Sequence, residues 1–178
     1  MITQHEILDQ ILNHYQPKIG RDFTGYKNHC YRVLNIYVWL AQQKMTVSQA
    51  EIDQAAIALA FHDLGIWTDK TLDYLPPSER EAQQYCNQYP DLDRQLIMAM
   101  INEHHKISAY TGDKRVEFFR QADLVDFSLG VFRFDLDKAT LQQLNQQFPN
   151  AGFHQLLTIL ATKNLFKHPF KPAPMMKW

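Results

Sequence analysis

Hydrophobic side chains recur at helical spacing along most of the chain. In the first segment they stand at Ile7, Leu8, Ile11 and Leu12. This periodicity predicts a helix over residues 3–15, which Pro17 and Gly20 bring to an end. Residues 24–44 contain many β-branched and aromatic side chains, as strands do, yet their apolar positions also follow the helical period. We therefore predict a second helix there.

Capping signals and loop residues divide the rest of the chain. Ser48 and Glu51 have the spacing of a capping box, which predicts the start of a helix that ends near Gly65. Ser78 and Glu81 repeat this pattern and predict another helix, which runs to about residue 89. The same periodicity predicts four more helices: one that ends near His105, one that ends before Gly130, and two over residues 138–148 and 152–165.

The pattern as a whole predicts an all-α fold, a bundle of about seven to nine helices. We find no internal repeat and no linker before residue 165, so we expect a single domain over residues 1–168. Residues 169–178 contain three prolines and are expected to form an irregular C-terminal tail.

Composition and charge narrow the class of partner. The formal net charge is −1, so the chain lacks the basic surplus that nucleic-acid binding requires. Cys30 and Cys86 form no CxxC pair, which fits a reduced compartment, although one disulfide is compatible with the count. The first residues lack the layout of a signal peptide, and the longest apolar run, residues 55–61, is far shorter than the roughly 20 residues that span a bilayer. We expect a cytoplasmic protein with no nucleic-acid or membrane partner.

Polar residues interrupt the apolar helix faces at four positions. His62 and Asp63 continue the stripe of the third predicted helix, His29 continues that of the second, and Asp123 follows Phe119 on a later one. Each residue alone has an ordinary explanation, since a core histidine can be hydrogen-bonded and an aspartate can end a helix. Together, two histidines and two aspartates on core-facing stripes form a donor set suited to a divalent metal ion.

These residues also carry a resemblance to a known family. The order His29, His62-Asp63, Asp123, with its local sequence at residues 25–33, 58–65 and 121–126, resembles the HD superfamily of metal-dependent phosphohydrolases. The similarity covers about residues 20–130, and the segment Phe-His-Asp-Leu-Gly at residues 61–65 is its most specific part. It implies an HD-type helical bundle in which these four residues bind one divalent ion, whose identity among Mn, Fe, Mg, Ni and Zn the sequence does not distinguish.

The resemblance also implies roles in catalysis. Asp63 would position or deprotonate the attacking water, and His104 or His105 would protonate the leaving oxygen. His104 continues an apolar stripe and is expected to face the metal, whereas His105 and Lys106 are expected to line the substrate entrance. The ordinary alternative is a solvated helix end, where these residue types are common.

Two further cations, Lys27 and Arg32, are candidates to attract an anionic substrate, although an exposed arginine is an equal interpretation of Arg32. The implied activity is the hydrolysis of a phosphomonoester or phosphodiester, with a small phosphate ester such as a nucleotide as the substrate.

One departure from the family bears on the number of metal ions. Relatives with two or three metals, among them iron-dependent oxygenases, carry a further histidine where this chain has Pro76-Pro77-Ser78-Glu79. A single ion is therefore expected, unless Asp73, Glu79 or Glu81 supplies an oxygen ligand. Two alternatives stay open: an oxygenase with paired iron ions, and a non-catalytic binding or regulatory domain that uses the metal as a clamp.

Overall fold

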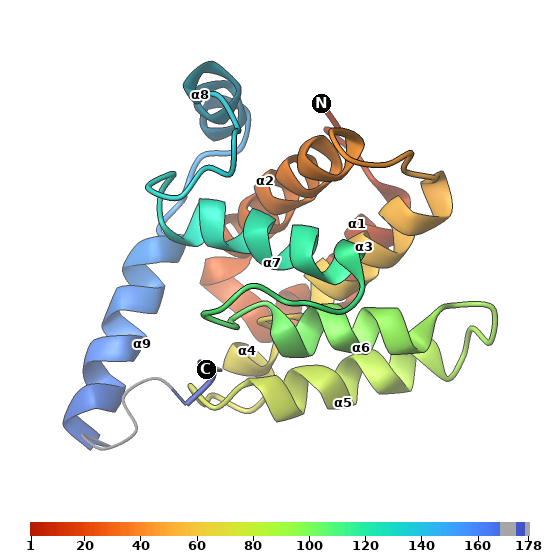
Figure 1. Ribbon diagram of the computed structural model, residues 1–178. Helices are drawn as coiled ribbons and strands as arrows, with labels where there is room; N and C mark the ends of the chain where they lie inside the picture. The colour runs from red at the N-terminus through yellow and green to blue at the C-terminus, as the bar shows by residue number, and fades with distance from the viewer. Residues whose placement is uncertain (168–173, 177–178) are drawn as a thin grey trace.

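The computed structural model describes residues 1–167 and 174–176. The described part contains nine α-helices and no strand, which confirms the all-α prediction (Figure 1). The helices are α1 (Glu6–Ile19), α2 (Phe23–Gln42), α3 (Gln49–Phe61), α4 (Gly65–Thr68), α5 (Leu75–Cys86), α6 (Arg94–Glu103), α7 (Lys114–Phe127), α8 (Lys138–Gln147) and α9 (Phe153–Lys167). A 3-10 turn over Gly20–Asp22 joins α1 to α2. Of the predicted tail, residues 169–173, 177 and 178 lie outside the described residues, as does His168.

Pro17 does not end the first helix as predicted. α1 continues through Pro17 to Ile19 and stops at Gly20, whose φ of 64° suits glycine and whose N–H bonds to the Gln16 carbonyl. Ile19 is buried, and the burial of this side chain favours the extra turn despite the missing N–H of proline.

The two predicted capping boxes have different outcomes. At Ser48 both reciprocal bonds with Glu51 are present, and α3 begins there as predicted. At Ser78 the prediction is wrong, because α5 already begins at Leu75 with prolines in its first turn. The Ser78 hydroxyl is buried and accepts a hydrogen bond from the Gly65 N–H at 2.9 Å.

Gly65 brings the start of α5 close to the end of α3. A Cβ atom at position 65 would lie 2.3 Å from the Tyr74 carbonyl oxygen, so only glycine permits this approach. After α3 the chain turns at His62 and forms the short α4. The loop that follows α4 then returns, so that Tyr74, just before α5, lies against Gly65 at the start of α4.

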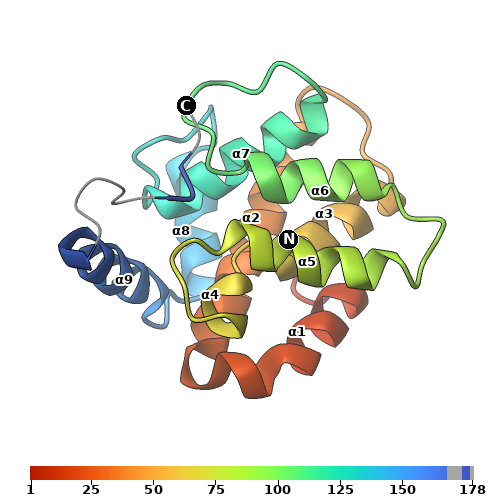
Figure 2. The same ribbon diagram turned by 90° about the horizontal axis from the view of Figure 1, so that it is seen from below.

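The core lies where α2, α3, α6 and α7 pack together, with α1 and α5 on the outside of α3. α2 and α7 lie side by side through the middle of the bundle in both views (Figures 1 and 2). α9 lies at the edge of the molecule opposite the loop that joins α5 to α6. Among the described residues, no helix combines the length and the apolar composition needed to cross a membrane.

Candidate metal centre

The fold brings together the four polar residues that interrupt the apolar stripes. His29 comes from the middle of α2, His62 and Asp63 from the turn that follows α3, and Asp123 from α7. All four side chains are buried, with exposed fractions between 0% and 4%. They lie in the core because the stripes on which they stand are the packed faces of α2, α3 and α7.

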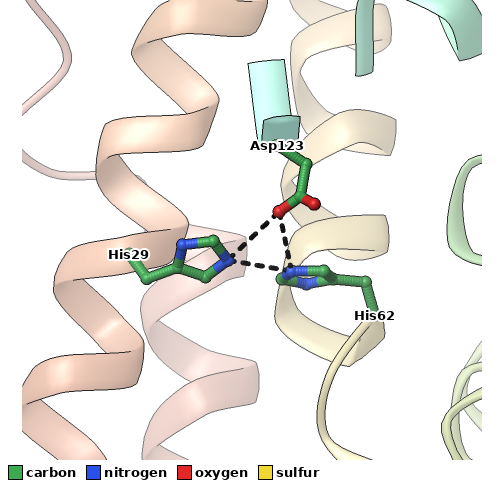
Figure 3. A group of neighbouring side chains, drawn as sticks. All are labelled: His29, His62 and Asp123. Atoms are coloured by element: carbon green, nitrogen blue, oxygen red, sulfur yellow. Dashed lines mark hydrogen bonds and ion pairs between the residues drawn. The ribbon is translucent and has the colours of Figure 1, made fainter. Parts of the chain in front are cut away.

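The nitrogen and oxygen atoms of His29, His62 and Asp123 converge on one point (Figure 3). The two Nε2 atoms are 3.0 Å apart, and Asp123 Oδ1 is 3.4 Å from His29 Nε2 and 3.7 Å from His62 Nε2. Ligands about 2.0–2.2 Å from a shared ion are roughly 3.0–3.5 Å from one another. The three side chains are thus arranged as the donors of one cation would be.

The Asp63 carboxylate faces the same His62 nitrogen. Its Oδ2 is 3.4 Å from His62 Nε2 and 3.9 Å from His29 Nε2, and its Oδ1 is 3.6 Å from His104 Nε2. We refer to His29, His62, Asp63, His104 and Asp123 together as the His–Asp cluster.

Hydrogen bonds on the far side of each ring fix which nitrogen faces the cluster. His29 Nδ1 is 2.7 Å from Asp126 Oδ2, and His62 Nδ1 is 2.8 Å from the Leu59 carbonyl oxygen. A carboxylate and a carbonyl only accept hydrogen bonds, so both Nδ1 atoms carry the proton. The Nε2 atoms of both rings therefore face the cluster, as those of metal ligands do.

His104 repeats this arrangement. Its Nδ1 lies 2.6 Å from the Ile101 carbonyl oxygen, so its Nε2 also faces the cluster as an acceptor. That Nε2 and Asp63 Oδ1 are both buried, and within the part of the chain that the structure describes neither has a hydrogen-bond partner. Buried polar atoms without a partner are rare and require an explanation, and a cation between them would satisfy both.

Two carboxylates set the electrostatics of the cluster. Burial by itself lowers the pKa of His62, but Asp63 and Asp123 beside it raise that pKa to about 9. Burial raises the pKa of both aspartates, yet the surrounding imidazoles bring each below its usual range. Both aspartates are therefore ionised at neutral pH, and without a cation His62 also keeps a proton on Nε2. A bound metal ion would displace this proton and take its place as the positive charge of the cluster.

These observations fit a metal ion. The donor set combines imidazole nitrogen with carboxylate oxygen, which suits borderline and hard divalent cations. The groups that can hold an ion are His29 with His62 and Asp123, His62 with Asp63 and His104, and His104 with His105 and Asp123. In the described residues, none of Asp73, Glu79 and Glu81 belongs to such a group.

The ion pair between Arg32 and Asp126 is the main feature that the sequence did not predict. Arg32 donates from Nε at 2.5 Å and from Nη2 at 2.8 Å to Asp126, and its Nη1 bonds to the Phe148 carbonyl. The Arg32 side chain is 1% exposed. Because the side chain is buried and paired, Arg32 is not placed to attract the substrate as predicted. The alternative prediction of an exposed arginine is wrong as well. The arginine instead fixes Asp126, which in turn orients His29.

Tyr74 is a second neighbour of the site that sequence periodicity does not reveal. It stands in the loop before α5, and its buried hydroxyl is hydrogen-bonded to His105 Nε2. Burial, with Asp63 and Asp123 nearby, raises the pKa of Tyr74 well above its usual value, so the hydroxyl keeps its proton. Gly65 provides the close approach that places this loop here.

His105 lies beside the cluster with its Nδ1 4.0 Å from Asp123 Oδ2. Burial and the neighbouring His104 lower the pKa of His105 to about 3, so the ring is neutral at pH 7. His105 and Lys106 line a cavity of about 490 Å³ that also reaches Asp123. Both residues therefore lie at a cavity beside the cluster, and their expected role at a substrate entrance stays a prediction.

Lys27 does not lie at this entrance. Its ammonium group pairs with Asp9 of α1 at 2.7 Å and lies over the Tyr31 ring. His154, at the start of α9, has no role predicted from the sequence. Its Nε2 donates to the Asp126 carbonyl at 2.8 Å, which ties α9 to the residue that orients His29.

Comparison of the chain with protein-family models, with curated proteins and with solved structures finds no match. The site must therefore be interpreted from its own geometry.

Proposed function

We propose that this protein is a metal-dependent hydrolase of phosphate esters. The observation that carries the proposal is the set of three imidazole Nε2 atoms, each turned toward the cluster by a bond on the far side of its ring, which meet two ionised carboxylates in one buried cluster. The resemblance of residues 20–130 to the HD phosphohydrolases agrees with it. His29, His62, Asp63 and Asp123 would bind one divalent ion.

The position of the cluster supports catalysis rather than a purely structural clamp. Two cavities reach it, one lined by Asp123, His105 and Lys106 and the other by Asp63, His29 and His105. A structural site is closed by protein ligands, whereas a catalytic site leaves positions for water and substrate. A divalent ion bound here would lower the pKa of water toward roughly 7 and neutralise charge on a phosphoryl group.

The residues of the chain supply the remaining steps. Asp63 is ionised, and its Oδ1 has no hydrogen-bond partner among the described residues, so it can orient a water molecule or accept its proton. His105 lines both cavities, and its neutral ring can donate a hydrogen bond to the leaving oxygen. Lys106 adds a positive charge at the entrance, which attracts an anionic ester.

The proposal is tested by elemental analysis of the purified protein followed by a screen of the metal-replete form. The panel holds phosphomonoesters, cyclic and linear phosphodiesters, and nucleotides, each tested with and without oxygen. We expect oxygen-independent release of phosphate or alcohol from at least one class, abolished by chelation. Retention of a metal with no turnover of any class would overturn the proposal and favour a binding domain. Two irons per chain with oxygen-dependent turnover would favour an oxygenase.

A further inference from the structure

A large apolar cavity lies between α9 and the His–Asp cluster. Its volume is about 400 Å³, within the range of pockets that enclose small organic ligands. Its apolar wall is formed by Leu72, Phe127, Leu129, Leu157, Ala161 and Met175. We call it the α9 cavity. α9 packs against α2 near its own start and then runs along the edge of the molecule (Figure 1).

The α9 cavity is continuous with the proposed metal centre. His29, Asp63 and Asp123 line its inner end, together with His105. A molecule whose phosphate group lies at the cluster would therefore extend its organic part along α9. This continuity distinguishes the cavity from an apolar groove that a protein partner would cover.

The chemistry of the wall excludes a strongly polar occupant. Among the described residues, no lysine or arginine lines the α9 cavity. The hydroxyls of Thr158 and Thr162 each donate to the carbonyl one turn earlier in α9, at His154 and Thr158. The His154 ring is bonded to the Asp126 carbonyl. The extra phosphates or sugar hydroxyls of a nucleotide would lose their hydration here without gaining matching partners.

A second cavity is also lined largely by apolar side chains, but it differs from the α9 cavity in containing cationic residues. The cavity lined by Lys106 also holds the Arg120–Glu117 ion pair, and it meets the α9 cavity at His105 and Asp123. Positive charge near the cluster therefore lies on this side, while the α9 side is apolar. The two cavities separate the charged end of a ligand from its apolar end.

The rim of the α9 cavity is also apolar. Phe127 is 46% exposed and Leu129 is 69% exposed, although both are large hydrophobic side chains. Leu129 has a φ of 53°, an unfavourable backbone conformation for a leucine. This backbone conformation holds the Leu129 side chain at the cavity. Exposed apolar groups around a cavity are typical of a site that takes up an apolar ligand.

We propose that the substrate is the phosphate ester of an apolar alcohol, whose hydrocarbon chain occupies the α9 cavity while its phosphate lies at the His–Asp cluster. The inference rests on the proposed function and names the substrate class of that site. It predicts that kcat/KM depends on the length of the hydrocarbon chain of the substrate rather than on a base or a sugar.

The test is a series of ethyl, butyl, hexyl and octyl phosphates below their micellar concentrations, with adenosine 5′-monophosphate as the polar comparison. Each methylene group that enters the cavity is expected to raise kcat/KM by about fourfold. The nucleotide is expected to be a poorer substrate than octyl phosphate by at least about a hundredfold, since several methylene groups contribute. Equal kcat/KM for ethyl and octyl phosphate, or preference for the nucleotide, would overturn the inference.

Two variants test whether the hydrocarbon chain of the substrate lies in the α9 cavity. Ala161→Trp fills the cavity from α9 and is expected to lower the octyl-to-ethyl ratio of kcat/KM by at least about tenfold. Thr162→Trp narrows the same wall and should act in the same direction. Lys163→Trp places the same bulk on the same helix outside the cavity and should leave the ratio unchanged. An unchanged ratio in both cavity variants would contradict the placement.

Binding of non-hydrolysable octylphosphonate and ethylphosphonate, followed by calorimetry, gives a readout that does not depend on turnover. Octylphosphonate should bind more tightly and with a negative heat-capacity change, and Ala161→Trp should reduce both effects. If no ester is hydrolysed but octylphosphonate still binds more tightly than ethylphosphonate, the proposed hydrolase activity is wrong, while the binding of an apolar chain in the α9 cavity is supported. If esters are hydrolysed without dependence on chain length, the substrate class fails and the hydrolase stands.

Discussion

Asp126 Oδ2 lies 2.7 Å from His29 Nδ1, and the same carboxylate accepts hydrogen bonds from Nε and Nη2 of Arg32. Burial raises the pKa of Asp126, but the hydrogen bonds from Arg32 and His29 bring it below its usual range. The carboxylate is therefore charged and accepts a hydrogen bond from His29 Nδ1. This bond leaves His29 Nε2 as the atom that faces the cluster. One residue thereby links a buried ion pair to the proposed metal centre.

Asp126→Asn should weaken metal binding by about 10–100-fold, as loss of the partner that orients a metal-binding histidine does. It should also lower the free energy of unfolding by about 3–5 kcal/mol, because the buried Arg32 loses its counter-charge. Metal titration and urea unfolding measure the two effects. Asp137→Asn is the matched control, since this exposed cap of α8 tolerates either residue. Unchanged metal affinity in Asp126→Asn would contradict the orienting role.

Asp63→Asn preserves the shape of the side chain and removes its charge. Activity on a phosphate ester should fall by at least about 10²-fold, the typical loss of a general base, and a lower metal content should add to this fall. Measurement of kcat at saturating metal separates the two contributions. Asp63→Asn protein that turns over as fast as wild type would show that the activity belongs to a contaminant.

His105→Ala should leave the metal bound and remove a hydrogen bond that stabilises charge on the leaving oxygen. The effect on kcat should therefore be large for alkyl phosphates and small for nitrophenyl phosphate, whose leaving group needs no such hydrogen bond. Metal analysis of the variant and a comparison of the two substrates check this expectation. His14→Ala, which removes an exposed histidine from α1, serves as the control. An equal loss for both substrates would remove His105 from the role of hydrogen-bond donor.

The Glu117–Arg120 pair should make stability depend on pH. Burial raises the pKa of Glu117, but the Arg120 guanidinium and the Tyr110 N–H lower it below the usual 4.5. The charged pair therefore stabilises the fold above about pH 4.5, and this contribution disappears as pH falls through the lowered pKa. Glu117→Gln should lower the free energy of unfolding by about 1–3 kcal/mol at pH 7.

Urea unfolding of wild type and Glu117→Gln between about pH 3 and pH 7 measures this difference directly. The gap between the two proteins should close as the pH falls below about 4, while other carboxylates titrate equally in both. A gap that stays constant over this range would show that packing, rather than charge, is what the substitution removes.

Local sequence patterns are sufficient to predict the helical fold and the residues of the His–Asp cluster. Helical periodicity marks the faces that pack, so a polar residue on such a face, as at His29, His62 and Asp123, must find its partner inside the protein. This inference needs no knowledge of the tertiary arrangement. The Ser48 capping box is likewise a local interaction between neighbours along the chain, which is why its prediction is confirmed.

The tertiary structure decided the contacts between residues far apart in the sequence. Arg32 lies on a helix face whose packing against Asp126 and Phe148 no local pattern specifies, so the sequence left it as an anion-binding candidate. Tyr74 reaches the site from a loop, and it does so only because Gly65 lets two backbone segments approach. The α9 cavity has the same origin, since its walls come from α2, α7, α9 and the loop before α5. Short-range spacing encodes which side of a helix is buried, whereas the partner across the interface depends on how all the helices pack together.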